Sequence, residues 1–190
     1  MRVVLPALVA ALLAATGCAS SNGSPPPSPV DVRVAMPDAS LPGMHLTDAS
    51  FDAAGAAADA VHPKDLQTLL QASGFVGARE RTWAGIRGAF ARVVVRAWVF
   101  SSPDGAASFL AWVRQRPAEL IGTAQPVAGT ALPDSIVLAM HEPSGCCHEE
   151  TPIYLASWQR DRVVWTIRAS GPKIRTTPVV SLVTQIAQEV

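Results

Sequence analysis

One short segment of the sequence gathers side chains that could bind a metal ion or carry out thiol chemistry. Its reactive residues are His141, Cys146, Cys147 and His148. Thiolate and imidazole groups together are suitable ligands for zinc or copper(I). The two cysteines are adjacent, so they lack the two-residue spacing of common zinc and thioredoxin-like sites. The segment is therefore a candidate metal or disulfide site with an unusual spacing.

The state of the cysteine pair has three alternatives. Cys146 and Cys147 could form a vicinal disulfide, which is strained because adjacent Cα atoms lie about 3.8 Å apart, below the roughly 4.4 Å of ordinary disulfides. They could instead bind a metal together with His148 and His141. They could also stay as free thiols or bond to another chain, with a redox role. The residues alone do not choose among these states.

The sequence gives little support for catalysis. A nucleophilic triad can be drawn from Asp134, His141 and Ser144, but these residues share one irregular segment without a nucleophile elbow. The sequence also lacks the phosphate-binding loop, the dinucleotide-binding glycine motif and the H-E-x-x-H zinc motif. We therefore expect a protein that is not an enzyme.

A second candidate site depends on a predicted sheet. Arg92, Arg96 and Trp98 alternate with apolar residues and so fall on one face of a strand, while Trp158 and Arg168 belong to a later pair of strands. If the uncovered face of the sheet carries all five side chains, it forms an aromatic and cationic surface for an acidic or sugar-like ligand. This assignment depends on strand register, which the sequence does not determine.

The spacing of apolar residues predicts the elements that hold these sites. Helices are expected over residues 63–73, from Ser102-Pro103-Asp104 to about residue 117, and from a cap at Thr176 or Thr177 to the end of the sequence. Strands are expected at residues 92–100 and 135–140, with a hairpin over 153–168 that turns near Arg160-Asp161. This order indicates an α+β fold, a mainly antiparallel sheet with helices packed on one face.

The first residues have the pattern of an export signal. Arg2 precedes the apolar run from Val3 to Ala15, and the small residues Thr16-Gly17 stand directly before Cys18. This arrangement resembles the lipobox of bacterial lipoproteins, which implies that Cys18 is acylated and becomes the new N-terminus. The covalent lipid on Cys18 would then hold the protein at the cell membrane, facing the extracytoplasmic side.

Three regions follow from this interpretation. Residues 1–17 are the predicted signal peptide. Residues 18–60 are expected to form a Ser-, Pro- and Ala-rich tether and a loosely ordered segment with a short strand near Val32 to Met36. Residues 61–190 are the predicted single domain. In an oxidising compartment, with Cys18 bound to lipid, Cys146 and Cys147 are the only cysteines left for other chemistry.

The charge balance narrows the choice of partners. The sequence has 15 basic and 15 acidic residues. Such a balance excludes the basic surface typical of nucleic-acid binding and provides no polybasic patch for lipid headgroups. We therefore expect no nucleic acid as a partner, and contact with the membrane through the lipid alone.

The order of elements, with the phrases Phe100–Ala106 and Ile167–Gly171, resembles small exported actinobacterial lipoproteins of unassigned function. More distantly, it is similar to the PsbP/Mog1-like domains found in some of them. This resemblance implies a binding or accessory role. The combined expectation is a non-enzymatic lipoprotein that binds a small ligand or an envelope protein and needs no cofactor besides its lipid. The alternative is a metal- or redox-handling lipoprotein that uses the Cys146-Cys147-His148 segment.

Overall fold

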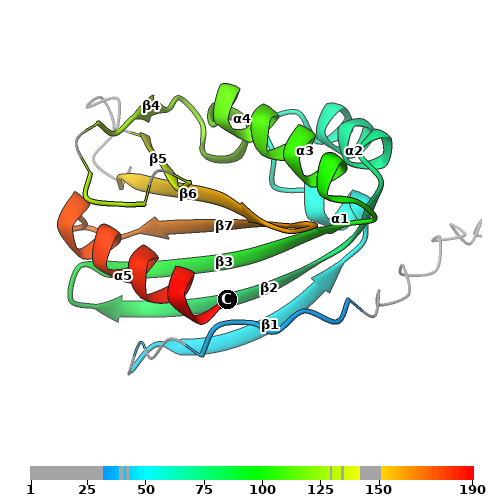
Figure 1. The fold of residues 1–190 in the computed structure, drawn as a ribbon. Coiled ribbons are helices and arrows are strands. Elements are labelled where there is room, and N and C mark those ends of the chain that lie inside the picture. The colour runs from blue at the N-terminus through cyan, green and yellow to red at the C-terminus, as the bar shows by residue number, and fades with distance from the viewer. Residues whose placement is uncertain (1–31, 39–40, 42, 129, 134, 142–150) are drawn as a thin grey trace, which may run out of the picture.

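A computed structural model describes residues 32–38, 41, 43–128, 130–133, 135–141 and 151–190. Within these residues the chain forms one sheet with the strand order β1-β2-β3-β7-β6-β5-β4 (Figure 1). The strands are β1 (His45–Phe51), β2 (Phe75–Arg87), β3 (Phe90–Phe100), β4 (Gln125–Pro126), β5 (Val137–His141), β6 (Ile153–Arg160) and β7 (Val163–Ser170). Neighbouring strands run antiparallel throughout. The predicted α+β class with an antiparallel sheet is confirmed.

The central strands are apolar on both faces. Val93 and Val95 of β3 are buried on one face of the sheet, and Val94 and Trp98 are buried on the other. A strand of this kind needs cover on both sides, which places it at the centre of a sheet. β7 pairs with it and turns back to β6 at Asp161, whose φ of 52° lies in the left-handed region that Asp tolerates. The predicted strand and the predicted turn are both confirmed.

The described residues form the helices α1 (Ala53–Ala57), α2 (Pro63–Ala72), α3 (Pro103–Gln115), α4 (Ala118–Ile121) and α5 (Thr176–Glu189). α3 starts as the sequence indicates, because the hydroxyl of Ser102 accepts a hydrogen bond from the Gly105 N–H at 3.1 Å. The expected threonine cap of α5 is wrong. Arg175 occupies the cap position without a side-chain hydrogen bond, and the hydroxyl of Thr176 instead lies 3.2 Å from the hydroxyl of Tyr154.

Helices cover both faces of the sheet (Figure 1). On one face Val183 and Ile186 of α5 belong to the same buried cluster as Trp165 of β7. On the other face α1 to α4 pack on the sheet, and Phe109 of α3 meets Trp98 with ring centroids 4.9 Å apart. The expectation of helices on one face needs this correction, because both faces of the central strands are apolar and each must be removed from water.

The fold begins earlier in the chain than the sequence indicates. β1 pairs with β2 along its whole length, and α1 buries Ala56 and Ala57. Val32 is buried too, although residues 32–38 form no strand. The predicted start of the domain at residue 61 and the predicted strand near Val32 to Met36 are therefore wrong. Small alanine side chains carry a weak apolar signal, so this part of the sequence resembles a loop.

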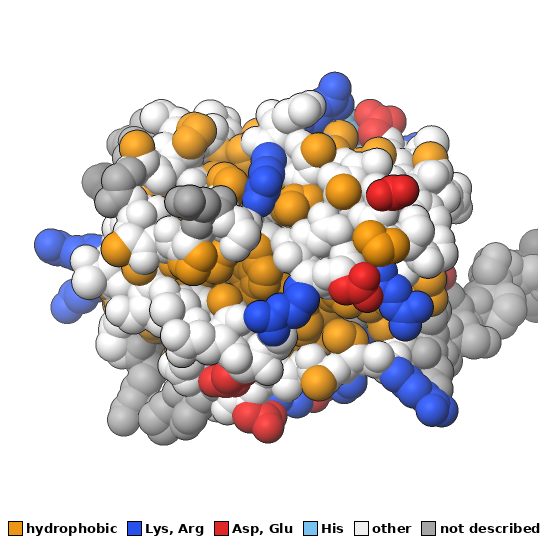
Figure 2. Space-filling model, in the orientation of Figure 1, with side chains coloured by type: hydrophobic (Ala, Val, Ile, Leu, Met, Phe, Trp, Pro, Cys, Tyr) orange, Lys and Arg blue, Asp and Glu red, His pale blue; other side chains and the backbone are white. Residues whose placement is uncertain are grey.

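Basic and acidic side chains are interspersed on the face that carries α5, with hydrophobic side chains visible between them (Figure 2). This mixture is what the equal numbers of basic and acidic residues lead us to expect. Among the described residues, no helix has the length and apolar character needed to cross a membrane.

Candidate functional site

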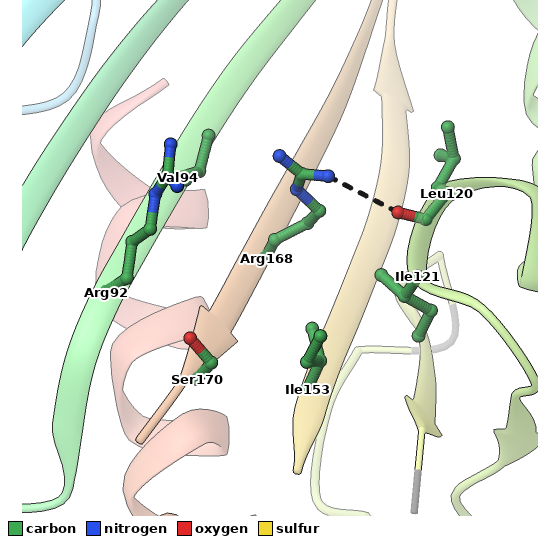
Figure 3. A pocket seen from close by; sticks show the side chains of 7 residues that line it. All are labelled: Arg92, Val94, Leu120, Ile121, Ile153, Arg168 and Ser170. Carbon is green, nitrogen blue, oxygen red and sulfur yellow. Dashed lines mark hydrogen bonds between the residues drawn. The ribbon is translucent and has the colours of Figure 1, made fainter. Parts of the chain in front are cut away.

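A pocket opens on the sheet face that carries α1 to α4. Its lining residues are Arg92, Val94, Leu120, Ile121, Ile153, Arg168 and Ser170 (Figure 3). Its volume is about 200 Å³, below the roughly 300–1,000 Å³ of typical sites for drug-sized ligands. The pocket therefore has room for a small molecule or for one end of a larger one.

Strand register brings these side chains together. Arg92 of β3 lies opposite Ser170 of β7, and two residues along β3, Val94 lies opposite Arg168. Ser170 in turn lies opposite Ile153 of β6. Because alternate residues of a strand share a face, the three strands present these side chains to the same side. The single turn of α4 completes the wall with two aliphatic side chains (Figure 3).

A buried ion pair lies further along the same face and joins β3 to β2. Arg96 and Glu80 lie opposite each other in the register. The Nε of Arg96 donates to the Glu80 carboxylate at 2.7 Å, and its Nη2 donates to the same oxygen. Its Nη1 donates to the carbonyl of Ala56 in α1 at 2.8 Å, while Thr82 donates to the second Glu80 oxygen at 3.1 Å. Both buried charges are thus satisfied.

Asp59 connects this ion pair with the pocket. Its Oδ2 lies 3.7 Å from Nη2 of Arg96 and 3.6 Å from Nη2 of Arg168. Arg168 also donates a long hydrogen bond of 3.3 Å to the carbonyl of Leu120 (Figure 3). Burial lowers the pKa of Arg168, and the positive charge of Arg96 lowers it further, while Asp59 acts in the opposite direction. Arg168 is therefore a largely buried cation whose described contacts are long.

Arg92 is the exposed cation at the pocket. Within the part of the chain that the structure describes, its guanidinium makes no hydrogen bond or ion pair. Arg96 and Arg168 lie beside the carboxylates of Glu80 and Asp59, and Arg92 adds a third cation, so this group of five residues carries one net positive charge. A pocket with this excess and with aliphatic walls suits an anion that carries an apolar part.

Neither tryptophan of the predicted ligand surface lines this pocket. Trp98 shares the face of Arg92, Arg96 and Arg168, but it is buried, and its indole N–H donates to the hydroxyl of Thr166 at 2.9 Å. Trp158 lies opposite Trp165 in the register and belongs to the cluster beneath α5, on the other face. The prediction that all five residues share an open face is therefore wrong for Trp158. Both faces of β6 are apolar, so its alternation could not show which face Trp158 takes.

The other sequence-predicted site lies mainly outside the described residues. Cys146, Cys147, His148 and the triad members Asp134 and Ser144 belong to the part that the structure does not describe. His141 ends β5, and its Nδ1 donates to the carbonyl of Thr123 at 2.7 Å. No three His, Cys, Asp or Glu side chains of the described ranges are grouped so as to hold a metal ion.

A contact at the residue before the pocket wall ties the start of α2 to α4. The Nδ1 of His62 lies 2.9 Å from a carboxylate oxygen of Glu119, and the N–H of Val61 donates to the Glu119 carbonyl at 3.0 Å. The hydrogen bond to Glu119, followed by its negative charge, raises the pKa of His62. Because Glu119 directly precedes the two residues of the pocket wall, this contact helps to hold α4 over the sheet.

The sequence indicated three charged residues of this site, Arg92, Arg96 and Arg168, but not the others. Glu80 and Asp59 were not predicted as partners of the arginines, and α4 was not predicted at all. The available signals were weak. Asp59 ends an alanine-rich run, and Leu120-Ile121 is a short apolar pair between Pro117 and Gly122. The register between β2 and β3 places Glu80 opposite Arg96. This register cannot be read from the sequence, so the role of Glu80 could not be predicted.

No protein-family profile matches the sequence, and no curated protein sequence matches it either. The fold is similar to that in the crystal structure of the extracellular domain of PknH from Mycobacterium tuberculosis, with a TM-score of 0.50. The two chains are 12% identical, and the similarity covers 76% of this chain and 83% of the other. At this identity the comparison establishes a shared fold.

Proposed function

We propose that this protein is a lipid-anchored domain on the extracytoplasmic side of the cell membrane, and that it binds a ligand in the pocket between α4 and the sheet. The observation that carries the proposal is the pocket itself. In it Arg92, which has no partner among the described residues, and Arg168, whose contacts are long, lie beside aliphatic walls. The signal and lipobox pattern that ends at Cys18 supports the location. The fold similarity to the extracellular domain of a mycobacterial kinase is in keeping with it.

Binding is the function that this arrangement supports better than catalysis. Arg92 and Arg168 remain protonated at neutral pH and so offer charge and hydrogen-bond donors, but no proton acceptor or nucleophile. The hydroxyl of Ser170 is the one other polar side chain that lines the pocket within the described residues. The carboxylate described nearest to these cations, that of Asp59, lies 3.7 Å from Arg96 and 3.6 Å from Arg168, so it faces two cations rather than a proton to be abstracted.

The ligand-binding proposal is tested with a screen of small molecules against the full chain, followed by NMR. We expect hits that shift the side-chain Nε–Hε signals of Arg92 and Arg168 and the methyl signals of Ile121 and Ile153. Hits that map only to other surfaces, or a chemically broad screen without hits, would contradict a binding role for this pocket. Signals of β1 residues, which lie far along the sheet order from β6, serve as the internal control.

The location is tested separately on the full chain expressed in a bacterium that matures lipoproteins. We expect the mature protein to begin at Cys18, to carry acyl chains in mass spectra and to sediment with membranes. Cys18→Ser should abolish the lipid-bearing mass. A mature chain that starts at residue 18 without added lipid would contradict the anchoring proposal and leave the binding proposal to its own test.

A second candidate function is metal or redox handling through Cys146, Cys147 and His148. One observation favours it. A carbonyl oxygen can only accept, so the hydrogen bond to Thr123 places the proton of a neutral His141 ring on Nδ1 and leaves the lone pair on Nε2. Thiol titration of the folded protein, paired with metal analysis, tests this function. Two unreactive cysteines without bound metal would remove it.

A further inference from the structure

The ligand class follows from the charges and walls of the pocket, on the premise that the proposed binding function holds. The cations come from two adjacent strands, Arg92 of β3 and Arg168 of β7, which lie on the same side of the sheet (Figure 3). Arg92 makes no hydrogen bond or ion pair with the described residues. Arg168 has five N–H donors, yet the described chain receives a single hydrogen bond from it, at 3.3 Å. Donors of both guanidinium groups are therefore available to a ligand.

The charge of this cluster limits the charge of the ligand. The carboxylates of Glu80 and Asp59 leave one positive charge uncompensated among the three arginines. One monoanion balances that excess, whereas a phosphate monoester, with roughly −1.5 to −2 charges at neutral pH, would exceed it. Planar guanidinium groups also match the two oxygens of a carboxylate.

The rest of the pocket is apolar. Val94, Leu120 and Ile121 are buried side chains that line it, and Ile153 lies at its far side from Arg92. A ligand that places its charge at the arginines must therefore put its body against aliphatic groups. The volume of about 200 Å³ limits this body to a short chain.

We propose that the pocket binds a small aliphatic carboxylate, with the carboxylate at Arg92 and Arg168 and the hydrocarbon against Leu120, Ile121 and Ile153. Asp59 is the internal competitor of this ligand. Its carboxylate lies 3.6 Å from Arg168 and is largely exposed, so it offers the same guanidinium a negative charge in the empty pocket. Removing the charge of Asp59 and removing that of Arg92 should therefore have opposite effects on affinity.

The test is calorimetric titration of the full chain with hexanoate, hexanol, hexylammonium and inorganic phosphate, with NMR to locate each probe. We expect hexanoate to bind at least tenfold more tightly than hexanol or phosphate. Affinity should rise about fourfold for each methylene added from butanoate to hexanoate, which corresponds to roughly 0.8 kcal/mol per buried CH₂. Arg92→Gln should weaken hexanoate binding about tenfold, and Asp59→Asn should strengthen it several-fold.

Arg160→Gln is the matched control, because Arg160 is exposed and lies at the opposite end of β6 from Ile153. Its affinity for hexanoate should equal that of the wild type. Equal binding of hexanol and hexanoate, tighter binding of phosphate, or an Arg92→Gln variant with unchanged affinity would each overturn the carboxylate assignment. If hexanol or hexylammonium binds best and shifts Ile121 and Ile153, the pocket remains a binding site and only its ligand class is wrong. If none of the probes shifts these residues, the carboxylate assignment fails, and the broader screen decides the binding function independently.

Discussion

Arg96 connects the stability of the domain with the charge of the pocket. Its guanidinium binds Glu80 of β2 and the Ala56 carbonyl of α1, and it lies 5.0 Å from the ring centroid of Trp98 and 5.2 Å from that of Phe51. The guanidinium of Arg96 thus contacts residues of three other elements, β1, β2 and α1. Because the pair with Glu80 is buried, losing either partner leaves a charge without compensation in a medium of low dielectric constant.

This leads to a prediction for the buried pair. Arg96→Met or Glu80→Leu should each lower the free energy of unfolding by about 3–5 kcal/mol, while the double variant should lose much less than the sum of the two, because two uncharged side chains leave no unpaired charge. Urea denaturation of the three variants measures the coupling. Losses that simply add would mean that the two residues act independently and would contradict the buried pair.

A second prediction for a single residue concerns His62, at the N-terminus of α2. When its ring is protonated, the helix dipole opposes the positive charge, and the carboxylate of Glu119 compensates for it. Since the pKa of His62 is raised, the protonated pair stabilises the fold fully below the unfolded pKa near 6.5, and this contribution is lost as pH rises through the folded pKa. We expect an NMR titration midpoint above about 6.5, and a melting temperature that falls slightly between pH 6 and pH 8 relative to His62→Gln.

Glu119→Gln provides the control for the titration of His62. Without the carboxylate, the midpoint of His62 should return toward the ordinary value of histidine. An unchanged midpoint for His62 in this variant would show that Glu119 does not cause the shift.

At the scale of elements, strong periodicity could be read directly from the sequence. β3, the β6–β7 hairpin and α3 were predicted because their apolar residues recur at strand or helix spacing and a cap or turn residue marks their limits. β1 and α1 were not predicted. β1 is an edge strand with mostly exposed side chains, and α1 is one turn rich in alanine, so neither has an apolar period. Their structure depends on pairing with β2, a contact that the sequence does not encode locally.

The residues of the candidate site divide in the same way, into those that local alternation predicts and those that only long-range contacts bring together. Alternation within one strand placed Arg92 and Arg96 on the same face, whereas Arg168 joins them through the register between β3 and β7, which the sequence does not determine. Trp158 was misplaced because a shift of one residue in register moves a side chain to the opposite face. Asp59 and α4 reach the pocket from elsewhere in the sequence, and only the folded chain brings them to the arginines.

One prediction belongs to the contact between helices. Gly105 lies in the first turn of α3, where alanine would ordinarily favour the helix by about 1 kcal/mol. A Cβ at this position would lie 2.1 Å from the carbonyl oxygen of Ser73, at the end of α2. Gly105→Ala should therefore lower the free energy of unfolding by about 1–3 kcal/mol, because backbone must move to relieve the clash.

Ser108→Ala, on the same helix, should change the free energy of unfolding in the opposite direction. Ser108 is exposed, so the substitution changes helix propensity without a new contact and should leave the protein slightly more stable. Urea denaturation of both variants makes the comparison. Stabilisation by Gly105→Ala would contradict the close approach of α3 to the end of α2.

At the scale of the whole molecule, the sheet is a central layer between α5 on one side and α1 to α4 on the other (Figure 1). Each face has its own buried cluster, and the central strands belong to both. The pocket lies where the single turn of α4 covers the ends of β6 and β7. Its wall is therefore a short element, which the contact between His62 and Glu119 helps to hold in place. The pocket can therefore change shape with less disturbance than a site within either buried cluster.

The N-terminal limit of the domain provides the last prediction. Residues 61–190 lack β1 and α1, so they lose the Ala56 carbonyl that Arg96 binds, the paired hydrogen bonds from Arg81 to Asp48, and the buried Val32. The loss is of the order of the total stability of such a domain, about 5–15 kcal/mol. We expect residues 32–190 to unfold cooperatively, and residues 61–190 to show no sharp thermal transition and to bind a hydrophobic dye. Near-ultraviolet circular dichroism reports the same difference through the packing of Trp83 and Trp98. A chain of residues 61–190 with a cooperative transition within a few degrees of the longer one would mean that β1 and α1 add little to the fold, and the domain would then begin at residue 61.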